Sequence, residues 1–184
     1  MAIVFIPDRQ VVITEVEEIK RYLAGSGIEY DAWDLVPLDH DASSATILDA
    51  YRDKLDEVKA KGGYTSVDIV DVQPSTPGLD EMLARFNREH WHDEDEVRFT
   101  VGGRGLFHIH PADSAVVAIE VRPGDMIRVP RGTRHWFNLC NTREIKAIRF
   151  FQDKSGWTPQ YTGSAEDAKY EPVCLGASYF PHSR

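Results

Sequence analysis

The feature that most constrains the fold is a series of turn signals in the second half of the chain. From residue 90 onward, short runs rich in Val, Ile and Phe alternate with clusters of Gly, Pro and Asp. These clusters are Gly102–Gly105, Pro111–Asp113, Arg122–Asp125 and Pro130–Gly132. Closely spaced short strands with turns between them are typical of antiparallel sandwiches and small barrels. The sequence therefore predicts a strand-rich second half.

The first half has a different pattern, in which apolar residues recur at helical spacing. Thr14 with Glu17 has the spacing of a capping box, and Ser44 is placed to cap a second helix. We expect helices over residues 14–24, 44–62 and 77–87, and short strands over 2–6 and 67–72. The expected organisation is a single domain over 1–184, with a mostly helical portion over 1–88, a strand-rich core over 89–153 and an irregular tail over 154–184.

The charge composition of the chain limits the kinds of molecule that it is expected to bind. The 184 residues carry 21 Lys and Arg against 30 Asp and Glu, a net charge of −9, and no basic run is present. Such a chain is repelled by phosphate backbones and anionic lipid, so we expect no nucleic acid and no membrane as partners. No apolar stretch has membrane-spanning length and no secretory leader is recognisable, which favours a cytoplasmic protein. We therefore expect Cys140 and Cys174 to be reduced thiols.

The most informative segment runs from Glu89 to Phe99. Side chains alternate faces along a strand, so His90, His92, Glu96 and Arg98 share one face if a single strand runs through them. Two imidazoles and a carboxylate are the donors of non-haem Fe(II) sites. The alternative is a polar strand that faces solvent.

A second segment ends in another histidine. Gly124, Pro130, Gly132 and His135 follow one another at fixed spacing, as do His90, His92, Glu96 and Gly103 before them. The two sets resemble the two motifs of the cupins. That resemblance implies an antiparallel β-barrel or jelly roll, here with the N-terminal helical portion packed on it (an α+β chain). It also implies a metal held by His90, His92, Glu96 and His135. His108 and His110 lack a following carboxylate, and we interpret them as strand-end or surface histidines.

Nearly the whole chain is similar to one cupin family, the acireductone dioxygenases of methionine salvage. The segments Glu89–Phe99 and Val101–Phe107 carry most of the similarity, with Arg149-Phe150-Phe151 further on. The resemblance implies one Fe(II) or Ni(II) per chain, other divalent ions such as Co(II) or Mn(II) also fitting. The substrates would be dioxygen and 1,2-dihydroxy-3-keto-5-methylthiopentene, a chelating dianion. Fe(II) would give 4-methylthio-2-oxobutanoate and formate, whereas Ni(II) would give 3-methylthiopropanoate, formate and carbon monoxide.

The same resemblance assigns roles around the metal ligands. Arg98 would generate or hold the dianion; a surface ion pair is its alternative. Glu89 matches a residue linked to metal incorporation, and Asp95 matches an acidic residue linked to local structural change; a solvated charge is the alternative for both. Arg149 matches another arginine near the site, or is a buried pair partner. Phe137 shares a face with His135 and is the candidate for an apolar cleft.

Three alternatives remain open. The first is another mononuclear-metal cupin enzyme, such as a different dioxygenase, a decarboxylase or an isomerase. The second is a non-catalytic cupin that binds a metal or a ligand, and the third is a β-domain whose histidines are coincidental. We expect a monomer, because no coiled-coil pattern or exposed apolar helix is evident.

Overall fold

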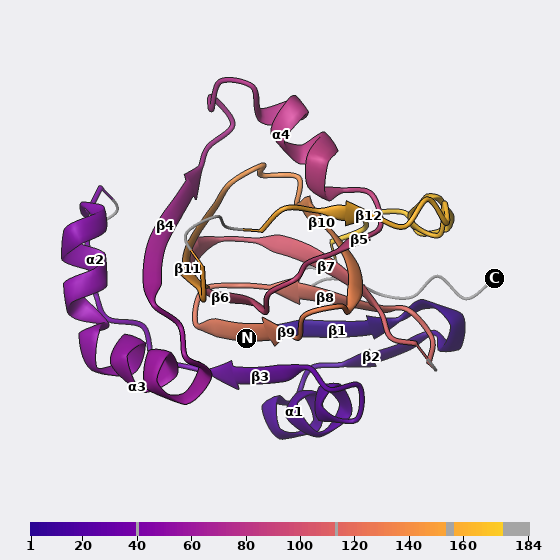
Figure 1. Cartoon of the computed structure of the whole chain (residues 1–184), viewed down its shortest axis with the longest axis horizontal. Coiled ribbons are helices and arrows are strands. Elements are labelled where there is room, and N and C mark those ends of the chain that lie inside the picture. The colour runs from indigo at the N-terminus through magenta and orange to yellow at the C-terminus, as the bar shows by residue number, and fades with distance from the viewer. Residues whose placement is uncertain (40, 113, 154–156, 175–184) are drawn as a thin grey trace.

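Two antiparallel sheets dominate the computed structural model, which describes residues 1–39, 41–112, 114–153 and 157–174 (Figure 1). In the described chain the strands form two sheets rather than one closed barrel, which matches the jelly-roll form of the expectation. The seven-stranded sheet has the order β12 (Gln160–Tyr161), β5 (His90–Trp91), β10 (Arg134–Leu139), β7 (Gly105–His110), β8 (Val117–Val121), β1 (Ile3–Ile6) and β2 (Val11–Ile13). The five-stranded sheet has the order β3 (Glu29–Ala32), β9 (Asp125–Val129), β6 (Glu96–Gly103), β11 (Ile145–Phe151) and β4 (Ser66–Val72).

The N-terminal portion contributes strands to both sheets. β1 pairs with β8, β3 pairs with β9, and β4 pairs with β11, in each case antiparallel. The expected strands over 2–6 and 67–72 are β1 and β4. Strands β2 and β3 were not expected, so residues 1–88 hold more sheet than a mostly helical portion would. The division of a single domain at 88 and 153 stays a prediction.

Within the residues that the structure describes, four α-helices lie outside the two sheets: α1 (Val16–Ala24), α2 (Ser44–Ala50), α3 (Arg52–Gly62) and α4 (Leu79–Phe86). Short 3-10 helices cover Pro7–Arg9 and Asp167–Lys169. Ser43, not Ser44, caps α2, because its hydroxyl accepts a hydrogen bond from the Thr46 amide at 3.2 Å. The capping box expected at Thr14 does not form: α1 begins after Glu15 with no side-chain cap.

The core has two layers, which follow from the alternation of side chains along the strands. Apolar residues of both sheets meet between them, among them Phe107, Ile119 and Ile127. On the opposite face of the five-stranded sheet, Val97 and Phe99 of β6 pack under α2 and α3. The polar residues Glu96 and Arg98 alternate with these two, so β6 turns them toward the space between the sheets.

The outer face of the seven-stranded sheet is covered by the C-terminal segment. We name residues 157–174 the C-terminal strap. Tyr170 of the strap lies 6.0 Å from Trp136 between ring centroids, and a disulfide joins Cys174 to Cys140. The expectation of two reduced thiols is therefore wrong, because the strap returns Cys174 to the end of β10. Residues 154–156 and 175–184 of the expected tail lie outside the described residues.

No helix within the described residues combines the length and the apolar character needed to cross a membrane.

Candidate metal centre

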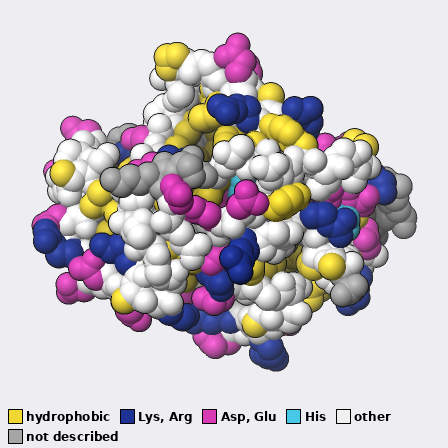
Figure 2. All heavy atoms as spheres, in the orientation of Figure 1, with side chains coloured by type: hydrophobic (Ala, Val, Ile, Leu, Met, Phe, Trp, Pro, Cys, Tyr) yellow, Lys and Arg dark blue, Asp and Glu magenta, His cyan; other side chains and the backbone are white. Residues whose placement is uncertain are grey.

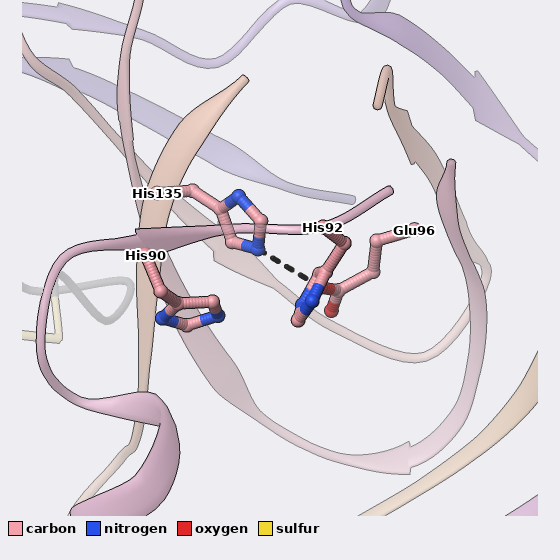
Figure 3. A group of neighbouring side chains, drawn as sticks. All are labelled: His90, His92, Glu96 and His135. Atoms are coloured by element: carbon pink, nitrogen blue, oxygen red, sulfur yellow. Dashed lines mark hydrogen bonds and ion pairs between the residues drawn. The ribbon is translucent and has the colours of Figure 1, made fainter. Parts of the chain in front are cut away.

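Four side chains meet where the two sheets face each other, and they come from three strand ends. His90 lies in β5 and His135 lies opposite it in β10, while His92 follows β5 and Glu96 begins β6. A turn over residues 93–95 carries the chain from one sheet to the other, so no single strand joins His92 to Glu96. The expected grouping is found, but the alternation of one continuous strand does not produce it. Figure 3 shows the three imidazoles and the carboxylate turned toward one another.

The four side chains form a compact and dry group. One potential ligand atom from each of them lies within 4.8 Å of the others, and each residue is at most 2% exposed. The three imidazole centroids are 4.6 to 5.1 Å apart. Little histidine reaches the face of the molecule in Figure 2, where acidic and basic side chains are interspersed. The alternative of a solvent-facing polar strand is wrong.

Backbone carbonyls fix the orientation of all three imidazoles. In His90 and His135, Nδ1 lies 2.7 and 2.8 Å from the carbonyl oxygen of the residue two positions earlier. His92 Nδ1 lies 3.1 Å from the Thr158 carbonyl of the strap. A carbonyl oxygen only accepts, so each Nδ1 carries the hydrogen and each Nε2 keeps a lone pair. Such partners are characteristic of metal-ligating histidines.

The Nε2 atoms of the three imidazoles converge, and a cation between them would satisfy their lone pairs. His90 Nε2 and His92 Nε2 have no hydrogen-bond partner, although both are buried. Glu96 Oε2 lies 3.0 Å from His135 Nε2 and 3.2 Å from His92 Nε2. Burial, followed by the neighbouring His135, lowers the pKa of His90 to about 4, so its ring is neutral at neutral pH. Three imidazoles and one carboxylate are a donor set that fits a mononuclear divalent metal with open coordination positions.

Arg98 lies beside this group and is buried. Its Nε lies 2.7 Å from Glu96 Oε1, as an ion pair without hydrogen-bond geometry. Its guanidinium lies over the rings of Phe137, Trp157 and Phe107, at 4.9, 5.1 and 5.5 Å from their centroids. Burial by itself would raise the pKa of Glu96, but Arg98 and the two nearby imidazoles hold it well below the usual value. The arginine is therefore not the surface ion pair of the alternative.

Glu89 is buried rather than solvated. Its carboxylate lies 2.6 Å from His110 Nδ1 and accepts hydrogen bonds from the hydroxyls of Thr162 and Ser164 in the strap. Burial would raise the pKa of Glu89, yet these partners lower it below its usual value. The solvated alternative is wrong for this residue, which joins β5, β7 and the strap.

Asp95 is also buried, and it faces away from the four-residue group. Its carboxylate accepts hydrogen bonds from Tyr64 Oη at 3.0 Å, Arg128 Nε at 2.7 Å and the Arg131 amide at 3.0 Å. Burial would raise the pKa of Asp95, but the Arg131 amide and the Arg128 guanidinium outweigh it and lower that pKa. Asp95 thus fixes the turn that sets the direction of Glu96.

Phe137 and Arg149 both lie near Arg98. Phe137 is buried, packs against Phe107 with centroids 4.8 Å apart, and forms one wall beside the Arg98 guanidinium. Arg149 pairs with Asp68 through two hydrogen bonds of 2.8 and 2.7 Å, and it is opposite Arg98 in the β6–β11 ladder. The structure thus places Arg149 in an ion pair near the site.

The interpretation of the other His-x-His pair as strand-end or surface residues is confirmed for His110, the last residue of β7, and is wrong for His108. His108 is buried and stacks on Trp136, with centroids 4.9 Å apart and an interplanar angle of 6°. His110 is partly exposed and contacts Glu89. Trp157 and Thr158 were not among the expected site residues, because the irregular segment before Pro159 carries no periodicity that could have placed them.

A family model and curated relatives place this chain in one family. The ARD/ARD' family matches residues 14–159. An acireductone dioxygenase from Picosynechococcus is 41% identical over 164 residues, which cover 89% of this chain and 93% of the relative. One from Stutzerimonas stutzeri is 43% identical over 153 residues, covering 83% of this chain and 84% of the relative.

A solved structure shows the same similarity. The acireductone dioxygenase from Bacillus anthracis, with a cadmium ion in its active centre, has a TM-score of 0.82 and 35% identity to this chain. The match covers 88% of this chain and 98% of that protein. The family match includes the four converging side chains, Arg98 and most of both sheets. The chain therefore belongs to the ARD/ARD' family, the acireductone dioxygenases.

Proposed function

We propose that the chain cleaves 1,2-dihydroxy-3-keto-5-methylthiopentene with dioxygen, as a metal-dependent acireductone dioxygenase. The observation that carries the proposal is the buried set of three inward-facing imidazole lone pairs and one carboxylate, with a guanidinium beside them. His90, His92, Glu96 and His135 would hold one Fe(II) or Ni(II). Family membership favours this activity over a decarboxylase, an isomerase or a non-catalytic cupin.

The metal would supply two open positions for a chelating substrate and would stabilise its second negative charge. With Fe(II), the substrate and dioxygen would give 4-methylthio-2-oxobutanoate and formate. With Ni(II), they would give 3-methylthiopropanoate, formate and carbon monoxide. These products follow from the family resemblance, so the same residues of this chain would have to serve both the Fe(II) and the Ni(II) reaction.

Arg98 would act on the charge of the substrate. An arginine remains protonated even when buried, and charge-assisted hydrogen bonds to an anionic oxygen are strong in a dry site. The guanidinium would therefore favour the deprotonated enediol and orient its oxygens. Arg98 pairs with Glu96 in this structure. When a bound cation neutralises the Glu96 carboxylate, the N–H donors of Arg98 would turn toward the substrate.

The aromatic rings around Arg98 would exclude water and receive the methylthio group. Phe137, Phe107 and Trp157 surround the guanidinium, so one apolar wall lies directly beside the charged group. Burial in this wall strengthens the electrostatic interaction of Arg98 with an anion. Phe137 is our candidate for contact with the apolar end of the substrate.

The test is anaerobic reconstitution of metal-free protein with Fe(II) or Ni(II), followed by addition of the acireductone and dioxygen and identification of the products. Glu96→Gln should lose metal binding, and Arg98→Met should keep the metal but lose dioxygen uptake. Metal binding by the wild-type protein without dioxygen uptake would reject the acireductone reaction. Failure to bind any metal would reject the four-residue site. The monomeric state and the cytoplasmic location stay predictions.

A further inference from the structure

The C-terminal strap connects the candidate metal centre to the disulfide. At its start, Trp157 Nε1 donates to the Asp95 carbonyl at 3.1 Å, and the Thr158 carbonyl lies 3.1 Å from His92 Nδ1. The strap then forms β12, whose Tyr161 pairs with His90 of β5. Two of the four proposed metal ligands are therefore oriented by backbone groups of the strap.

The middle of the strap contacts Glu89, next to His90. The Thr162 amide donates to the Glu89 carbonyl at 3.2 Å, and the Thr162 and Ser164 hydroxyls donate to its carboxylate. The Glu89 amide in turn donates to Asp167 Oδ1 at 3.3 Å. The strap thus surrounds the backbone just before the first proposed ligand.

Beyond Trp157, whose ring packs against Phe151 with centroids 4.7 Å apart, few apolar contacts hold this strap in place. Most of its residues are exposed and none is fully buried. Tyr170 lies near His108 and Trp136, with centroids 6.2 and 6.0 Å away, and the Cys140–Cys174 disulfide follows four residues later. Segments with little buried apolar surface open at low free energy, so the covalent bond is the strongest attachment at this end.

We propose that the Cys140–Cys174 disulfide is a redox latch that holds the strap closed and slows loss of metal from the centre. The proposal rests on the proposed function, because it concerns retention of that metal. A dithiol would open the latch: one thiolate attacks Cys174 Sγ, the more exposed sulfur, and the Sγ–Sγ bond breaks. The second thiol then releases Cys174, so both cysteines end as thiols and the dithiol leaves as a cyclic disulfide.

A metal site at the same place fits less well. Glu120 Oε and the two sulfurs lie within 4.8 Å of one another and would offer three donors to a thiophilic ion after reduction. However, Glu120 already pairs with Arg122 at 2.9 Å and lies 3.7 Å from Arg104. Two neighbouring cations oppose a third, which favours the disulfide as the function of this cysteine pair.

The experiment compares metal release before and after reduction. Nickel-loaded wild-type protein is divided, one half is treated with dithiothreitol and desalted anaerobically, and nickel transfer to a chromophoric chelator is timed for both halves. Reduction should speed release at least about tenfold, because an untethered strap is no longer held at high effective concentration. Cys174→Ser should release nickel at the fast rate with or without reduction. Val173→Ala, an exposed neighbouring change that keeps both cysteines, should behave like the wild type.

A second readout separates the latch from general destabilisation. Hydrogen exchange at the Thr162 amide should accelerate on reduction, whereas exchange at the Phe99 amide in β6 should not change. Equal nickel release in the two redox states, or two free thiols in the untreated native protein, would overturn the latch and leave the metal centre standing. If neither redox state holds nickel, the proposed function fails, and the claim about metal retention fails with it.

Discussion

Replacing Arg98 with methionine removes one of the two charges that form an ion pair at the site, and so isolates the contribution of the other. Arg98 Nε and Glu96 Oε1 are 2.7 Å apart, and both side chains are at most 9% exposed. Methionine keeps an unbranched apolar chain of similar length beside Phe137, so the change removes chiefly the positive charge. Glu96 would then remain as a buried carboxylate without its guanidinium.

The expected effect differs between the metal-free and the metal-loaded protein. Removing one partner of a buried ion pair costs about 3–5 kcal/mol, so metal-free Arg98→Met should be destabilised by about that much. In the loaded protein a divalent cation neutralises Glu96, and we expect about 2 kcal/mol of this loss to be recovered. By linkage, that recovery appears as tighter metal binding, by roughly 30-fold in Kd.

The assay is urea unfolding with and without Ni(II), together with a direct titration of Ni(II) binding. Arg149→Met is the matched control, because it removes a guanidinium whose partner Asp68 is 48% exposed. The control should lose no more than about 1 kcal/mol and leave Kd unchanged. Weaker nickel binding by Arg98→Met than by the wild type would refute the reasoning, since Arg98 would then assist the metal rather than compete for Glu96.

Three further predictions concern the surroundings of the site. Gly103→Ala should lower the free energy of unfolding in urea by about 3 kcal/mol or more, because φ is +68° and a Cβ would lie 2.3 Å from a backbone carbonyl oxygen. Gly132→Ala, with φ of +76° but no atom within 4 Å, should lose only about 1–2 kcal/mol. Asp95→Asn should destabilise the fold by about 1–3 kcal/mol at pH 7. Because the pKa of Asp95 is lowered in the fold, its carboxylate contributes its full stabilisation at pH values above the ordinary pKa of an aspartate. In a pH series of unfolding curves, the difference in unfolding free energy between wild type and Asp95→Asn should therefore narrow as the pH falls through the lowered pKa. Phe137→Leu should raise KM for the acireductone more than it lowers kcat; a purely catalytic defect with unchanged KM would place the methylthio group elsewhere.

The sequence alone was sufficient to predict the strand-rich second half and to identify the four residues of the candidate metal centre. Turn residues mark strand ends through local chemistry, and two separate local motifs supply the group, one with His90, His92 and Glu96 and the other ending in His135. The route by which these side chains meet was wrong, because the turn at 93–95 moves the chain between sheets. Periodicity describes one continuous element and carries no information about such a crossing.

Contacts between segments far apart in sequence were not predicted. The Thr158 carbonyl on His92 is a backbone group, which any residue type supplies, so no sequence pattern could indicate it. The disulfide was missed for a similar reason: two cysteines 34 residues apart reveal neither their distance nor their pairing. Strand β2 has only three residues and strand β3 only four, too few to establish a periodicity, so pairing with β1 and β9 decides their conformation.

The strand order has a consequence for synthesis on the ribosome. β1, β3 and β4 are made early, and β1 can pair early with β2, but the partners β8, β9 and β11 lie in the second half of the chain. Until residue 151 of β11 has emerged, at least one early strand presents an unpaired edge, which is the kind of surface that aggregates. Pairings at such long separation also make folding slow. A nascent chain of this protein should therefore depend on a holding chaperone for most of its translation and fold only near release.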